Sequence, residues 1–76
     1  MKQNETVFWG TAELVEARLN AHDILKFVYK ALERRKMAET ATYFDDATSD
    51  TYDELCIKSL RYARLADIHD IELAKQ

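Results

Sequence analysis

The sequence predicts an all-α protein, an antiparallel helical hairpin of two long helices that follow a short N-terminal segment. Among its 76 residues the chain has one glycine and no proline, whereas β-sandwiches, barrels and phosphate-binding loops depend on turn glycines. Apolar residues recur with the 3.6-residue period of an amphipathic helix over two long stretches. Hydrophobic residues make up 47% of the chain, which argues against disorder.

The first predicted helix spans about residues 12–39. Thr11 follows Gly10 and is suited to be its N-cap, because a threonine hydroxyl accepts hydrogen bonds from N–H groups of the first helical turn. Asn20 together with Asp23 offers an alternative, since a cap at Asn20 would divide the segment into two helices. The single long helix is favoured because one apolar stripe runs through this point in phase. The stripe consists of Leu14, Ala17, Ala21, Ile24, Leu25, Val28, Ala31 and Leu32.

The second predicted helix spans about residues 51–75 and follows a turn at about 40–50. Thr, Asp and Ser in this turn compete for backbone hydrogen bonds and disfavour a regular helix. Thr51 and Glu54 have the spacing of a capping box. The acidic stretch from Asp45 to Glu54, with five carboxylates in ten residues, is therefore interpreted mainly as a helix start. Residues 1–10 are predicted to be an arm or lid on a domain formed by residues 11–76.

The second helix is apolar over more than half of its circumference, which predicts burial on several sides. Its flank of Ile57, Leu60, Ile68 and Ile71 is left uncovered by a single neighbouring helix. The prediction is a homodimer in which two hairpins close a four-helix bundle around this flank. A chain of this size buries only about 60% of the surface of its unfolded state, so association adds needed stability.

Charge and composition limit the possible partners. Residues 1–44 carry seven basic and six acidic side chains (+1), and residues 45–76 carry four and eight (−4), which gives the net charge of −3. This balance disfavours nucleic acid, whose affinity comes from neutralised phosphates. No apolar run approaches the roughly 20 residues of a membrane span, and the N-terminus lacks the apolar region of a signal peptide. The lone cysteine fits a reducing compartment, so the predicted location is the cytoplasm.

Candidate chemical sites are weak, and the sequence predicts a protein that is not an enzyme and uses no metal or cofactor. A calcium loop that starts at Asp45 or Asp46 lacks the central glycine and the final glutamate. His22 and His69 are each followed by aspartate, but adjacent helical residues point about 100° apart and cannot easily share one ion. Cys56 lies on an apolar face, where a structural thiol is expected.

The predicted function is that of a small acidic interaction protein that binds and modulates another macromolecule. Bacterial and phage regulators and inhibitors of this size are the analogy. The partner-binding residues are predicted to be five aromatic and two acidic side chains: Phe8, Trp9, Phe27, Tyr43, Phe44, Asp45 and Asp46. One alternative is a nucleic-acid-binding helical bundle that uses the basic cluster Lys30, Arg34, Arg35 and Lys36. Another is a small-ligand binder with its pocket between protomers.

Overall fold

Four helices make up the described part of the chain, residues 6–76 of this computed structural model. They are α1 (Val7–Glu16), α2 (Ala21–Arg34), α3 (Glu39–Thr48) and α4 (Tyr52–Ala74). Residues 6–76 contain no β-strand, so the all-α prediction is confirmed. None of the helices in this range is long and apolar enough to cross a membrane.

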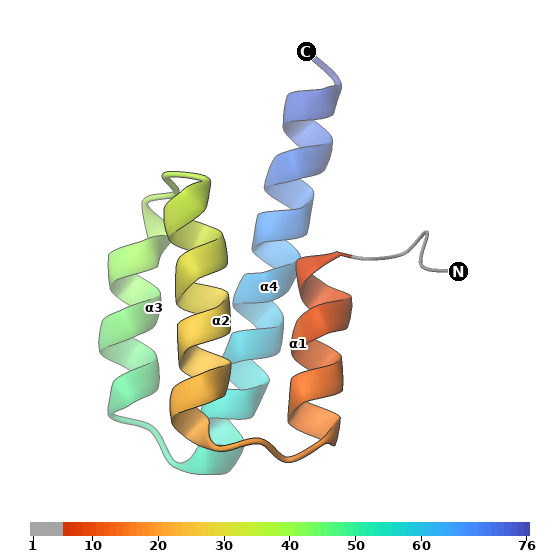
Figure 1. Cartoon of the computed structure of the whole chain (residues 1–76). Helices are drawn as coiled ribbons and strands as arrows, with labels where there is room; N and C mark the ends of the chain where they lie inside the picture. The colour runs from red at the N-terminus through yellow and green to blue at the C-terminus, as the bar shows by residue number, and fades with distance from the viewer. Residues whose placement is uncertain (1–5) are drawn as a thin grey trace.

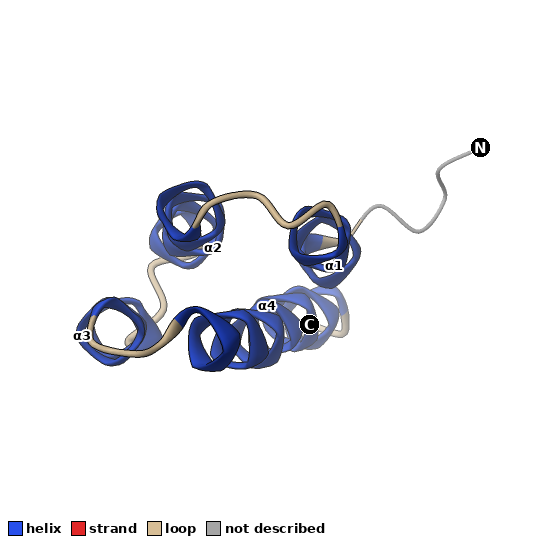
Figure 2. Cartoon of the chain, turned by 90° about the horizontal axis from the view of Figure 1, so that it is seen from below, coloured by secondary structure: helices blue, strands red, loops and turns tan. Residues whose placement is uncertain are grey.

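The longest helix, α4, packs against all three of the others (Figure 1). α2 also contacts both α1 and α3. The view from below shows that no helix of residues 6–76 lies on the side of α4 that faces away from α2 (Figure 2). The last turns of α4 extend beyond the ends of the other helices.

The core lies where α2, α3 and α4 meet. Its buried residues are Ile24, Val28, Leu32, Tyr43, Ala47, Leu55, Cys56 and Ala66. In α2 these residues recur every four positions, which is the buried stripe of an amphipathic helix. α1 adds the partly buried side chains Val7, Leu14 and Val15 to the edge of this core.

The predicted hairpin of two long helices is wrong, because the first long helix is divided into α1 and α2 by residues 17–20. The alternative cap is confirmed: the Asn20 side chain accepts a hydrogen bond from the backbone N–H of Asp23 at 2.9 Å. The Tyr52 hydroxyl donates to the carbonyl oxygen of Leu19 at 2.7 Å and fastens the connection to the start of α4. The chain therefore folds back at Asn20, and α1 and α2 lie side by side.

Both α1 and α2 end in a Schellman motif without glycine. After α1, the Leu19 N–H bonds to the carbonyl of Leu14 and the Arg18 N–H to that of Val15. The same two bonds follow α2, where Lys36 occupies the position equivalent to Arg18. Both residues have φ of 57°, the left-handed conformation that glycine adopts most easily.

We therefore expect Lys36→Gly to raise the free energy of unfolding by about 1 kcal/mol, because it removes the cost of a left-handed side-chain-bearing residue. Arg18→Gly should act in the same direction but less, since Arg18 also lies over the Tyr52 ring at 5.8 Å. Urea denaturation measures both effects. The matched control is Ala17→Gly, at φ −74°, which should instead destabilise by about 0.5–1 kcal/mol. Destabilisation by Lys36→Gly equal to that of the control would contradict the strain argument.

Two further boundaries differ from the prediction, and one agrees. Most of the predicted turn at 40–50 is helical, because α3 runs from Glu39 to Thr48. Residues 7–10 of the predicted arm form the start of α1, and residues 1–5 lie outside the described range. Thr11 is fully buried inside α1 rather than at its N-cap, which is Thr6. The predicted second helix is confirmed as α4, with the capping box of Thr51 and Glu54 at its start.

Candidate functional site

An open groove of about 400 Å³ lies between the N-terminal end of α1 and the length of α2. Its lining combines three apolar, four basic and one acidic side chain. The residues are Val7, Asp23, Lys26, Phe27, Lys30, Ala31, Arg34 and Arg35. The volume falls within the range of about 300–1,000 Å³ that is usual for ligand sites. We call this feature the basic groove.

The repeat of α2 explains why basic side chains gather in this groove. Lys26, Lys30 and Arg34 follow one another at four-residue spacing and form one exposed row. Each lies two positions from a core residue of the same helix, so it points away from the core. Side chains four residues apart have Cβ atoms about 5–6 Å apart, which makes the row a continuous strip of positive charge.

Phe27 forms an apolar surface within the groove because Gly10 lets it approach α1. A Cβ atom added to Gly10 would lie 2.9 Å from Cζ and 3.2 Å from Cε2 of the Phe27 ring. The ring therefore rests against the α1 backbone, yet 42% of the residue remains exposed. A half-exposed aromatic ring with restricted freedom is a suitable anchor for a binding partner.

Arg35 lines the groove, but its charge is already paired. Its Nε and Nη2 atoms donate to the two carboxylate oxygens of Asp70 at 2.9 and 2.7 Å, and Nη1 donates to the carbonyl of Ala31 at 2.8 Å. The hydrogen bonds between Arg35 and Asp70 raise the pKa of Arg35 and hold the pKa of the Asp70 carboxyl below its ordinary value. Of the predicted basic cluster, Lys30 and Arg34 line the groove as cations that are available to a ligand. Arg35 is already paired, and Lys36 does not line the groove.

One side of the groove is fixed by Asp67, which sequence reasoning missed. Its carboxylate accepts the backbone N–H groups of Val7 at 2.9 Å and Phe8 at 3.0 Å. An acidic side chain at a helix N-terminus satisfies free N–H groups and complements the helix dipole. Here the carboxylate belongs to α4, so no local sequence pattern around α1 predicts the contact. This contact holds the first turn of α1, including Val7, beside α2.

The structure does not gather the predicted aromatic residues into one surface. Trp9 and Phe44 are about half exposed on α1 and α3, whereas the Phe8 ring is partly buried beneath the guanidinium of Arg64. Tyr43, which the sequence predicts as a partner-binding residue, is fully buried, so its side chain is not accessible to a partner in this fold. It faces the core because helix α3 turns it toward Ser59 of α4, whose Oγ atom lies 2.7 Å from the Tyr43 hydroxyl.

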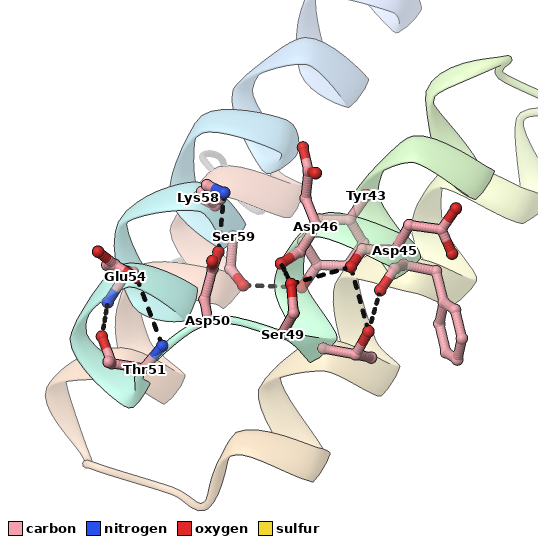
Figure 3. A network of polar contacts seen from close by, with 11 residues as sticks. Tyr43, Asp45, Asp46, Ser49, Asp50, Thr51, Glu54, Lys58 and Ser59 are labelled. Atoms are coloured by element: carbon pink, nitrogen blue, oxygen red, sulfur yellow. Dashed lines mark hydrogen bonds and ion pairs between the residues drawn. The ribbon is translucent and has the colours of Figure 1, made fainter.

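The acidic stretch is held by local bonds within and after α3 (Figure 3). Thr48 and Ser49 donate their hydroxyl groups to carbonyls of the preceding turn. The Asp50 carboxylate pairs with Lys58 at 2.9 Å. Asp45 and Asp46 are exposed on α3, on a different helix from the basic groove. Among residues 6–76, no three His, Cys, Asp or Glu side chains lie in a group that suits a metal ion.

The predicted apolar flank of the last helix faces outward in the structure. Ile57, Ile68 and Ile71 are 57%, 47% and 55% exposed, and Leu60 is partly exposed beside them. Within residues 6–76, one side of α4 is not covered by another helix (Figure 2). The basic groove and this outer face of α4 are therefore separate candidate surfaces within residues 6–76.

Comparison of the chain with protein-family models, curated proteins and solved structures gives no match.

Proposed function

We propose that this protein is a non-catalytic interaction protein that binds an acidic segment of another protein in the basic groove and modulates that protein. The observation that carries the proposal is the placement of half-exposed Phe27 beside the row of Lys26, Lys30 and Arg34. An aromatic anchor supplies affinity when a partner buries it. The surrounding cations supply orientation and fast association with a partner of opposite charge.

The chemistry of the groove favours a peptide segment that is both acidic and apolar. Val7, Phe27 and Ala31 offer apolar contact, while the row of cations offers positions for carboxylates. A ligand with an aliphatic or aromatic side chain between acidic ones matches both.

Selection from a library of random linear peptides tests the proposal directly. We expect the selected peptides to be rich in Asp and Glu around an apolar residue. The double variant Lys30→Glu/Arg34→Glu and the single variant Phe27→Ser should each weaken binding of such a peptide about tenfold or more. Fluorescence anisotropy with labelled peptide gives the dissociation constants.

The matched control is Lys36→Glu, which changes the net charge without altering the lining of the groove. It should reduce affinity much less than the double variant. Neutral or basic selected peptides, or binding that survives both the double variant and Phe27→Ser, would refute the proposed site.

Nucleic acid is the second candidate, because Lys26, Lys30 and Arg34 also suit the phosphates of a single strand. Three phosphate contacts with a single strand predict an affinity that falls about 20-fold between 50 mM and 200 mM salt. Labelled single-stranded DNA and RNA measure this dependence. Nucleic-acid binding that is lost in the double variant, while no acidic peptide binds, would replace the protein partner with a nucleic acid.

A further inference from the structure

The apolar residues on the outer face of α4 are spaced symmetrically on the two sides of Arg64. Ile57 and Ile71 each lie seven positions from Arg64, and Leu60 and Ile68 each lie four positions from it. All five residues share one face of α4, because their spacings of three and four follow one side of a helix. Four of them are exposed, and Leu60 is partly buried. The apolar residues of this face are therefore arranged symmetrically about Arg64.

We propose that the outer face of α4 binds a second copy of the chain, as an antiparallel pair of α4 helices with its two-fold axis at Arg64. In this register Ile57 faces Ile71 of the second copy, and Leu60 faces Ile68. A two-fold interface must be complementary to itself, and this face meets the condition with apolar contacts on both sides of the axis. The inference concerns a surface separate from the basic groove and does not depend on the function proposed for that groove.

The charged residues of the face support the same register independently. The register is fixed by the apolar residues alone, yet it also places Asp53 opposite Lys75 of the second copy. This pair occurs twice and joins opposite charges, which favours association. A shift that brings Ile57 opposite Ile68 would instead set Arg61 against Arg64 in both halves of the dimer.

The two copies of Arg64 would meet at the axis, and the structure shows how their charges avoid each other. The guanidinium carbon of Arg64 lies 5.4 Å from the centre of the Phe8 ring, within the distance of a cation–π interaction. The side chain therefore leans toward α1. Only its aliphatic stem then needs to pack at the axis, as is common for long basic side chains.

The size of the contact predicts a dimer of moderate affinity. The face from Asp53 to Lys75 is about 33 Å long at a rise of about 1.5 Å per residue. A single helix pair of this length falls below the roughly 800 Å² per partner of a standard stable interface. We therefore expect a dissociation constant in the micromolar range. The contact would also cover Ile71, which is 55% exposed in the single chain.

Sedimentation equilibrium over a range of concentrations tests whether the dimer forms and where. The wild-type chain should dimerise, and Ile68→Asp should weaken dimerisation by about tenfold or more while circular dichroism shows unchanged helix content. The matched control is Leu73→Asp, an exposed apolar residue of the same helix that points to its other side. It should leave the dimer largely intact.

Disulfide crosslinking tests the register. Arg64→Cys should form a covalent dimer on mild oxidation, because the two copies meet at the axis. Ile57→Cys or Ile71→Cys alone should not, since equivalent positions would be about 21 Å apart, and a disulfide needs Cα atoms within about 7 Å. A mixture of these two variants should crosslink. The wild-type chain, with Cys56 buried, is the background control.

Three outcomes would overturn the inference. The first is a monomer at high micromolar concentration. The second is crosslinking by Ile57→Cys alone, which indicates a parallel pair. The third is a dimer that persists in Ile68→Asp but is lost in Phe27→Ser, which places the contact at the basic groove.

Discussion

Replacing Asp67 with alanine is expected to lower the free energy of unfolding by about 2–4 kcal/mol and to loosen α1 from the rest of the fold. The Asp67 carboxylate accepts the N–H groups of Val7 and Phe8. Each hydrogen bond to a charged group contributes about 1.5–3 kcal/mol, and a negative charge at a helix N-terminus adds about 0.3–1 kcal/mol. The expected loss lies below the sum of these values, because both N–H groups are only partly buried and water replaces part of the interaction.

Urea denaturation measures the loss, and amide hydrogen exchange locates it. Exchange should accelerate in residues 7–16 more than in residues 21–34, because the removed contact holds α1 alone. Asp70→Ala is the matched control, since Asp70 is a half-exposed carboxylate of the same helix that pairs with Arg35 and does not contact α1; it should cost less than Asp67→Ala. Equal losses in the two variants, with unchanged exchange in α1, would show that Asp67 does not hold this helix.

Helix α4 could be predicted from the sequence because its signals are local. Thr51 and Glu54 form a capping box, and the apolar period that follows has no interruption. The sequence indicates the break between α1 and α2 only weakly, as the alternative to one long helix. The reason is that Arg18 occupies the left-handed position where glycine normally marks a helix end. The apolar stripe also continues in phase through the break, so periodicity and capping gave opposite indications.

Two other differences arise because tertiary contacts outweigh local preference. Helix α3 is rich in Thr and Asp and lacks a side-chain N-cap, so its sequence predicts a turn. It is stabilised by burial of Tyr43 and Ala47. The sequence predicts a helix boundary at Gly10, whereas Gly10 lies inside α1 and provides space for Phe27. Close approach between helices is a second reason for a glycine, and a single sequence does not distinguish it from a turn.

Only the part of the candidate site that lies along α2 could be predicted from the sequence. Lys30 and Arg34 share a face through their spacing, and the structure keeps them together in the basic groove. The pairing of Arg35 with Asp70 and the contact of Asp67 with α1 join residues 35 and 60 positions apart. Such contacts depend on how the helices pack, so they follow from the fold and not from any local pattern.

The second large effect is expected at the buried pair of Tyr43 and Ser59. Tyr43→Ala should lower the free energy of unfolding by about 3–5 kcal/mol, because it empties the volume of a fully buried aromatic side chain. Since Tyr43 is the largest side chain that α3 buries, this helix should unfold first, which the hydrogen exchange of residues 39–48 measures. Phe44→Ala is the control, because Phe44 is exposed on the same helix and should cost much less.

A double-mutant cycle separates the hydroxyl contact from the packing. Tyr43→Phe leaves the Ser59 hydroxyl without its partner at 2.7 Å, and Ser59→Ala does the same to the Tyr43 hydroxyl. Each single variant should cost about 1–3 kcal/mol, because it leaves a buried polar group unsatisfied. The double variant should cost less than the sum. Strict additivity would show that the two hydroxyl groups do not stabilise each other.

The same pair predicts how stability falls at high pH. Burial raises the pKa of Tyr43 to about 12 from an ordinary value of 10.0, so between these values the folded chain keeps a proton that the unfolded chain releases. The contribution of the protonated Tyr43 hydroxyl to the free energy of unfolding is complete below pH 10 and is lost as the pH rises toward 12. It amounts to on the order of 2 kcal/mol in total. Tyr43→Phe has no phenol to ionise at this position. The stability difference between wild type and Tyr43→Phe should therefore shrink over this range, and a constant difference would mean that the buried phenol does not titrate there.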